Sequence, residues 1–113
     1  MNDVVKDLKR ISPIICKDFV FAGFEGYIIE APYVMSAHAN AWRFMSNDHE
    51  QLTVITVNLD RLEPGEYAIK NYSENTGMLE ALLAKDLIEL PHRYVQQGFV
   101  SFPIVRRKTD TAR

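Results

Sequence analysis

Residues 51–58 constrain the fold more than any other part of this sequence. Their side chains would be apolar or β-branched on both faces of an extended segment: Leu52, Thr53, Val54, Ile55 and Val57. β-Branched residues favour strands, and a strand that is apolar on both faces is typical of the interior of a sheet rather than its edge. The sequence therefore predicts a β-sheet in which residues 51–58 form a central strand.

Other strand-like segments precede this one. Residues 19–22 and 27–30 are rich in aromatic and β-branched side chains, and Gly23 and Gly26 bracket a turn that would join the two segments as a hairpin. Residues 41–45 are separated from the central strand by a polar run that is typical of a hairpin connection. We therefore expect antiparallel strands in the first half of the chain.

The C-terminal half adds two strands. Pro64 and Gly65 mark a tight turn, because proline presets φ at the second turn position and glycine tolerates a positive φ at the third. Residues 66–70 follow as one strand and residues 99–105 as the last. Pro103 lacks a backbone donor, so it predicts that the last strand lies at an edge, or that its own N atom faces outward from the ladder.

A leucine-rich helix is expected between these two strands. Its apolar positions recur at intervals of three and four residues: Met78, Leu79, Leu82, Leu83 and Leu87. Asn75 or Thr76 would cap its exposed amides, and Pro91 limits its extension. Leu82 and Leu83 are expected in the core, because they lie in the middle of the apolar stripe.

A second, short helix is expected at the N-terminus, where apolar residues recur at helical spacing over residues 4–11 before Ser12 and Pro13 end it. The predicted fold is α+β, a mostly antiparallel sheet of five or six strands with both helices packed on one face. A chain of 113 residues, 47% of them hydrophobic, is expected to form one domain. Residues 106–113 are polar and are expected to be a frayed basic tail.

Charge and cysteine content narrow the functional classes. The net charge of −2 supplies no overall field that would attract nucleic acid or anionic lipid. Cys16 is the only cysteine, so no disulfide can form within the chain, and a buried, inert thiol is favoured over a nucleophile. No apolar run approaches the roughly 20 residues that span a bilayer. These features predict a cytoplasmic protein that does not enter the membrane.

No metal or other cofactor is expected. His38, His49 and His92 are the three histidines, and their spacing matches no compact metal-binding motif. The sequence also contains no Gly-rich phosphate loop.

The polar loop that precedes the leucine-rich helix is the candidate partner-binding surface. It contains Asn71, Tyr72, Ser73, Glu74 and Asn75. His92, Arg93 and Tyr94 are added to the surface, since Tyr and Arg are enriched at binding hot spots. The alternative is that the loop residues only satisfy the turn and the helix start, with Tyr72 packed inward.

Two other functional classes stay open. A small enzyme would use His92 together with Glu74 or Cys16, if these side chains met in one concave pocket. A nucleic-acid binder would use exposed aromatic residues and the basic tail, which contains Arg106, Arg107, Lys108 and Arg113.

One stretch carries a resemblance to known proteins. The sequence YAIKNYSENTGMLEALLAKDLIE, followed by QQGFVSFPIVR, resembles small accessory proteins of bacterial plasmids and phages, many of which have no assigned function. The resemblance implies a mobile-element protein that binds a host or competing-element protein, for example in a host defence or nucleic-acid-processing complex. It implies no catalytic residue. We therefore expect a non-catalytic protein-binding module with an unidentified partner, and a fold compatible with a homodimer formed through an edge strand.

Overall fold

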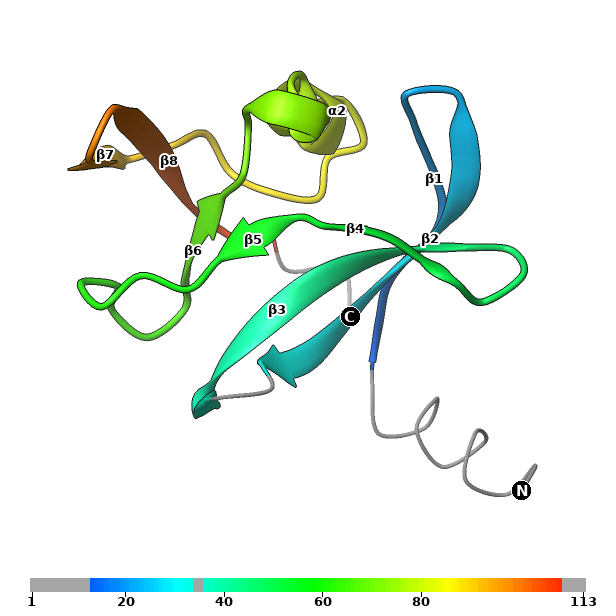
Figure 1. Ribbon diagram of the computed structural model, residues 1–113, viewed down its shortest axis with the longest axis horizontal. Helices are drawn as coiled ribbons and strands as arrows, with labels where there is room; N and C mark the ends of the chain where they lie inside the picture. The colour runs from blue at the N-terminus through cyan, green and yellow to red at the C-terminus, as the bar shows by residue number, and fades with distance from the viewer. Residues whose placement is uncertain (1–12, 34–35, 109–113) are drawn as a thin grey trace. The chain divides into compact units, whose positions relative to one another are not determined.

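A computed structural model describes residues 13–33 and 36–108, and contacts group the chain into two compact units, Met1–Val54 and Ile55–Arg113. Each unit is built on a four-stranded antiparallel sheet (Figure 1). The coarse prediction, mostly antiparallel strands with a helix in the C-terminal half, is confirmed. The expectation of one sheet with five or six strands is wrong, because the described residues form eight strands divided between two sheets. The single-domain organisation stays a prediction.

In the sheet of the first unit, each strand pairs with the next along the chain: β1 (Ile14–Phe21), β2 (Phe24–Tyr33), β3 (Ser36–Ser46) and β4 (Gln51–Val54). Ala22 and Gly23 join β1 to β2 with positive φ angles of 54° and 83°. Two consecutive positive φ angles are the geometry of a type I′ turn, whose twist matches the flanking strands. The predicted hairpin is confirmed, although Gly26 lies inside β2 rather than at the turn.

Close packing explains the glycine inside β2. A Cβ atom at Gly26 would overlap the carbonyl oxygen of Met45 on β3. Phe19 lies opposite Gly26 on β1, and its ring packs edge-on against Phe44 with centroids 5.2 Å apart. Phe19, Phe44 and Ile28 are all buried, which places the core of this unit on one face of β1, β2 and β3.

The predicted central strand is wrong. Residues 51–58 divide into β4 and β5 (Thr56–Val57), which belong to different sheets. Each of these short strands lies at the edge of its sheet, and the chain passes from one sheet to the other at Ile55, which is fully buried. The apolar pattern on both faces therefore reflects a crossing between two sheets rather than burial inside one.

The sheet of the second unit has the spatial order β5-β6-β8-β7, with β6 (Glu66–Ile69), β7 (Arg93–Gln97) and β8 (Val100–Arg106). Its apolar cluster contains Leu59, Ala68, Val95, Phe102 and Ile104. Four of these five residues alternate along β6, β7 and β8, as one face of a pleated sheet requires.

The leucine-rich helix is present in this unit as α2 (Met78–Ala84). Met78 and Leu82 are fully buried, whereas Leu83 is half-buried, so only one of the two expected core leucines is enclosed. Asp86 has a φ of 64°, and the N–H groups of Asp86 and Leu87 donate to the carbonyls of Leu83 and Leu82 at 3.0 and 3.1 Å. This Schellman geometry ends the helix before Leu87.

Pro103 does not lie at a sheet edge, because β8 is an interior strand. Gln97 and Val100 close a two-residue turn, which makes them a hydrogen-bonded pair. Pairs alternate in an antiparallel ladder, so Tyr94 and Pro103 form a non-hydrogen-bonded pair. On the other side of β8, pairing with β6 stops one residue short of Pro103. The proline is tolerated because neither neighbour requires its missing donor.

The expectation that the chain frays from Arg106 onward is also wrong. Arg106 ends β8, and Arg107 forms an isolated bridge with the segment that follows α2. The Nζ atom of Lys108 lies 2.7 Å from a carboxylate oxygen of Asp86. Arg106 donates to the carbonyl of Pro64 at 3.1 Å. The side chains of Arg106 and Lys108, two basic residues of the predicted tail, therefore have partners within the unit.

Two predictions fall outside the described part of the chain. The N-terminal helix over residues 4–11 and the end of the tail, residues 109–113, are among the residues not described. Within residues 13–33 and 36–108, no helix is long and apolar enough to cross a membrane.

Candidate functional site

Glu66 of β6 is the centre of a buried ion cluster in the second unit, with a side chain that is 2% exposed. Arg93 of β7 donates to both carboxylate oxygens, from Nη2 to Oε1 at 2.6 Å and from Nε to Oε2 at 3.1 Å. The Nε2 atom of His92 lies 2.7 Å from Oε2, and the backbone N–H of Glu63 donates to Oε1 at 2.9 Å. A forked guanidinium–carboxylate contact is among the stronger hydrogen-bonded pairs in proteins.

Sheet register brings the two charged residues of this cluster together. Glu66 pairs with Arg106 of β8, and Arg93 pairs with Ile104 on the other side of the same strand. Both side chains therefore lie on one face of the sheet, flanking β8. Arg93 also donates to the carbonyl of Arg61 at 2.9 Å, so the cluster ties β7 to the connection that precedes β6.

The cluster keeps Glu66 ionised. Hydrogen bonds from Arg93 lower the pKa of Glu66 far below its usual range, against the opposing effect of burial, and donors from Glu63 and His92 lower it further. A carboxylate with so low a pKa is a weak base at neutral pH. The arrangement is suited to holding β7 in place rather than to moving protons.

The residues of the enzyme hypothesis have other partners. His92 is paired with Glu66, while Glu74 forms an ion pair with Lys70 at 2.6 Å. Cys16 is buried in the first unit, and its Sγ lies 3.9 Å from Oδ1 of Asp18. The expected buried thiol is confirmed, and within the second unit His92 and Glu74 bond to different side chains.

The polar loop after β6 performs turn and capping chemistry. Asn71 Oδ1 accepts the N–H of Leu79 in the first turn of α2 at 2.9 Å. Asn75 is fully buried at the end of a short 3-10 helix, η1 (Ser73–Asn75), and Thr76 Oγ1 donates to the carbonyl of Ser73 at 2.9 Å. A side-chain cap is thus supplied by Asn71, eight residues away, where Asn75 or Thr76 was expected.

Tyr72 was expected either to belong to a partner-binding surface or to pack inward, and the structure shows features of both. Its ring packs edge-on against Phe102 with centroids 5.8 Å apart, yet the residue is 36% exposed. The Nζ atom of Lys70 lies 5.7 Å from the ring centroid and also bonds Glu74. This hydrogen bond from Lys70 lowers the pKa of Glu74 to about 2. Tyr72 is therefore anchored to the sheet while one part of it stays accessible.

The predicted surface is divided by the sheet. Tyr72 contacts Phe102, which faces Val95 across the β7–β8 ladder. Arg93 shares the face of Val95, whereas Tyr94 lies between them in the strand and points to the opposite face. The loop is thus linked to the face that carries Arg93, and Tyr94 belongs to a different surface.

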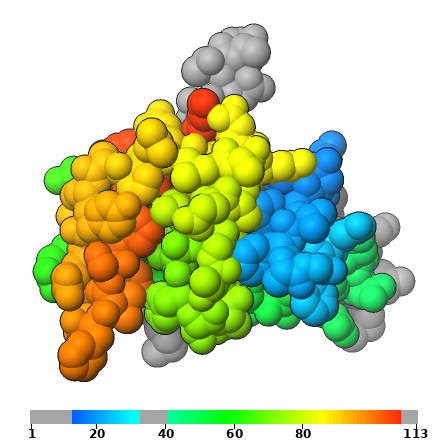
Figure 2. All heavy atoms as spheres, turned by 90° about the horizontal axis from the view of Figure 1, so that it is seen from above, coloured from blue at the N-terminus to red at the C-terminus, as the bar shows by residue number. Residues whose placement is uncertain are grey.

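The hairpin tip was missed by the sequence analysis. Phe99 was expected to begin the last strand, but it occupies the turn between β7 and β8 with Gly98, whose φ is 64°. Phe99 is 105% exposed, Tyr94 is 61% exposed and Leu90, shortly before β7, is 73% exposed. Figure 2 shows the hairpin, in orange, at the surface of the second unit. A glycine followed by one residue between two strand-like runs was the available signal.

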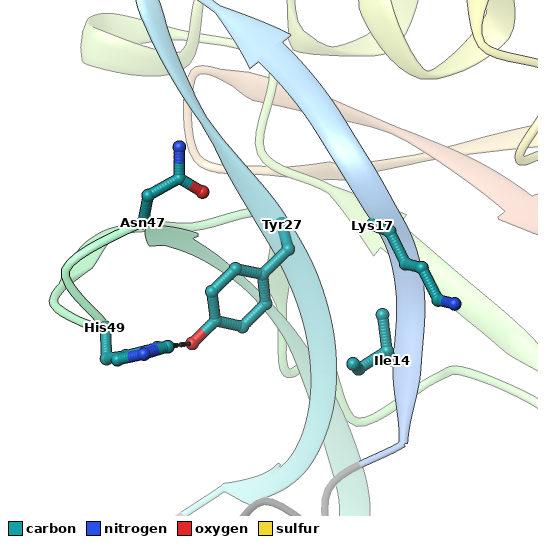
Figure 3. A pocket seen from close by; sticks show the side chains of 5 residues that line it. All are labelled: Ile14, Lys17, Tyr27, Asn47 and His49. Carbon is teal, nitrogen blue, oxygen red and sulfur yellow. Dashed lines mark hydrogen bonds between the residues drawn. The ribbon is translucent and has the colours of Figure 1, made fainter.

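The first unit contains a separate small pocket of about 230 Å³ (Figure 3). Its lining residues are Ile14, Lys17, Tyr27, Asn47 and His49. The Tyr27 hydroxyl and Nδ1 of His49 share a hydrogen bond of 2.8 Å, and burial raises the pKa of Tyr27. His49 is exposed and has a positive φ of 70°. Figure 3 shows Lys17 directed away from the Tyr27–His49 pair, so the polar groups do not converge on one point.

Metal ligands do not gather anywhere in the described residues: no three His, Cys, Asp or Glu side chains are placed to hold an ion. No protein-family model, curated protein or solved structure matches this chain. The contacts described above are therefore the basis for the functional argument.

Proposed function

We propose that this chain is a non-catalytic protein-binding module and that the β7–β8 hairpin contacts the partner. The exposure of Phe99 carries the proposal. Phe99 is 105% exposed at the tip and Tyr94 is 61% exposed on the neighbouring strand. Aromatic side chains are enriched in the buried core of protein–protein interfaces.

The base of the hairpin is held firmly, which favours binding. The Arg93–Glu66 contact fixes the start of β7, and Tyr72 packs on Phe102 of β8. A surface that is already ordered loses less conformational entropy when a partner binds. Tyr72, which is 36% exposed, packs on the opposite face of the sheet from Tyr94, so it lies outside the proposed surface.

The sequence indicates what kind of partner to seek. The resemblance of residues 67–106 to accessory proteins of plasmids and phages supports a protein of the host or of a competing element, within the cytoplasm. The strands of the hairpin carry two charged residues: Arg93 is paired with Glu66, and Arg106 donates to the carbonyl of Pro64. A protein partner is therefore favoured over nucleic acid, which requires several unpaired cations.

Capture experiments with matched variants test the proposal. Wild type, Phe99→Ser and Tyr94→Ser would be immobilised at low density and exposed to host extract, with bound proteins identified by mass spectrometry. Phe24→Ser is the control, because Phe24 is 56% exposed but lies in the first unit beside the β1–β2 turn. We expect a protein that is captured by wild type and Phe24→Ser, lost with both hairpin variants, at unchanged melting temperatures. Equal capture by all four proteins would contradict the proposal.

A further inference from the structure

The sheet edges in the described residues differ in how well they are protected against another strand. β1 has two register shifts and carries Lys17 and Asp18, and both bulges and charges discourage strand addition. β4 and β5 have only four and two residues. β7 forms five consecutive pairs with β8 without a register shift, and its one charged residue, Arg93, is bonded to Glu66. β7 is therefore the edge most open to another strand.

The backbone of β7 offers outward-facing groups at two positions. Because Gln97 and Val100 close the two-residue turn as a hydrogen-bonded pair, Val95 bonds β8 as well. Tyr94 and Gln96 then direct their N–H and C=O groups away from β8. The free edge of β7 therefore presents two backbone donors and two backbone acceptors in alternation, and another antiparallel strand can pair with all four.

We propose that β7 of a second copy of this chain occupies this edge, antiparallel, about a two-fold axis at Val95. Tyr94 of each copy then pairs with Gln96 of the other, and all the outward donors and acceptors are satisfied. Arg93 falls opposite Gln97, so no like charges face each other across the new ladder. This inference deepens the proposed function and rests on it, since it makes a second copy a partner of the same hairpin.

The hairpin tip fits the same symmetry. Phe99 lies in the turn that follows Gln97, the last residue of β7, and Leu90 and Pro91 lie just before Arg93, its first residue. The axis at Val95 sets Gln97 of one copy opposite Arg93 of the other, so the turn that carries Phe99 lies toward the partner's segment that contains Leu90 and Pro91. Leu90 is 73% exposed and Phe99 is 105% exposed in the single chain. In the dimer, Phe99 of each copy would cover Leu90 of the other copy.

Sedimentation velocity over a broad concentration range tests the pairing. Gln96→Pro removes a donor that points away from β8, so it blocks strand addition without disturbing the hairpin. Gln96→Ala keeps that donor and is the matched control. We expect wild type and Gln96→Ala to dimerise reversibly and Gln96→Pro to weaken the association about tenfold or more, with melting temperatures alike at low concentration. Dimers unaffected by Gln96→Pro, or a wild type that stays monomeric up to about 1 mM, would overturn the inference.

The register has its own test, which does not depend on the proline variant. Phe99→Ser and Leu90→Ser should each weaken the dimer, and the double variant should be little weaker than either one, because both remove the same contact. Both side chains are exposed in the single chain, so folding is not at risk. Independent, additive effects of the two substitutions would rule out a two-fold axis at Val95.

Failure of this inference and failure of the proposed function give different results. If wild type is monomeric at all concentrations and Phe99→Ser abolishes capture of a partner, the proposed function is supported and the dimer is excluded. If Gln96→Pro weakens the dimer but Phe99→Ser does not change capture, the proposed function is excluded and the dimer is supported. The two measurements use the same purified proteins.

Discussion

Replacing Glu66 by glutamine tests whether the ion cluster holds the second unit together. Gln preserves the size of the side chain and can still accept the N–H of Glu63. It removes the negative charge that Arg93 and His92 share at distances of 2.6 to 3.1 Å. The substitution therefore changes the electrostatics of a position that is 2% exposed without opening a cavity.

The expected loss of stability follows from the partners that Glu66 keeps and loses. Hydrogen bonds to a charged group contribute roughly 1.5–3 kcal/mol each, and breaking a fully buried ion pair costs about 3–5 kcal/mol. The Arg93 side chain is 36% exposed, so water takes up part of its charge in the variant. We expect Glu66→Gln to lower the free energy of unfolding by about 2–3 kcal/mol, toward the lower end of these ranges.

Urea unfolding between pH 3 and pH 7 measures both the size and the origin of this loss. The pKa of Glu66 is lowered in the folded state, so the unfolded chain binds the proton more readily as the solution is acidified. The advantage of wild type over Glu66→Gln is therefore complete above the unfolded pKa of about 4.3 and declines as the pH falls below it. Glu74→Gln is the control, because Glu74 is 56% exposed and its ion pair is screened by solvent. A wild-type advantage that is within error at neutral pH, or that is the same at pH 3 and pH 7, would refute the reasoning.

Four further outcomes are expected. Gly26→Ala should lower the melting temperature strongly, because the added Cβ overlaps a backbone carbonyl on β3, and a small shift in a thermal melt would show that the strands separate easily there. Ala22→Asn should raise stability in urea by about 0.5–1 kcal/mol, because asparagine tolerates the positive φ of 54° better than alanine, and an unchanged midpoint would contradict this. Leu82→Ala should destabilise by about 2–5 kcal/mol, and half-buried Leu83→Ala by clearly less; equal losses would mean that the burial of the two leucines is alike. Chelator treatment should leave the melting temperature unchanged, since no described side chains are grouped to hold an ion, and a lower melting temperature would reveal a metal.

Local signals located α2 and the first hairpin, whereas β7 was not predicted. Spacing of three and four residues located α2, and Gly23 located the β1–β2 hairpin, because periodicity and permitted φ values act within a few residues. For the polar loop, capping was one of two alternatives and named Asn75 or Thr76, whereas Asn71 provides the cap, eight residues before Leu79. The cysteine was expected to be buried, and it is.

Errors arose where the outcome depends on which strands become neighbours. Residues 51–58 carry apolar side chains on both faces, which is equally compatible with one central strand or with two edge strands of different sheets. Pro103 was assigned to an edge, yet a proline is accepted inside a sheet wherever the adjoining ladder does not need its N–H. Neither choice can be made from the residues of one strand alone.

The candidate site shows the same division. Sequence reasoning selected His92, Arg93 and Tyr72 from their residue types, and it determined the absence of a disulfide and of ligand-spaced histidines, because these depend only on which residues are present. The tertiary structure decided that Glu66 accepts hydrogen bonds from Arg93, 27 positions later in the sequence, and that Phe99 is exposed to solvent at a turn. Ion pairing and exposure depend on contacts between strands, and the register that creates those contacts is set by the packing of the whole sheet.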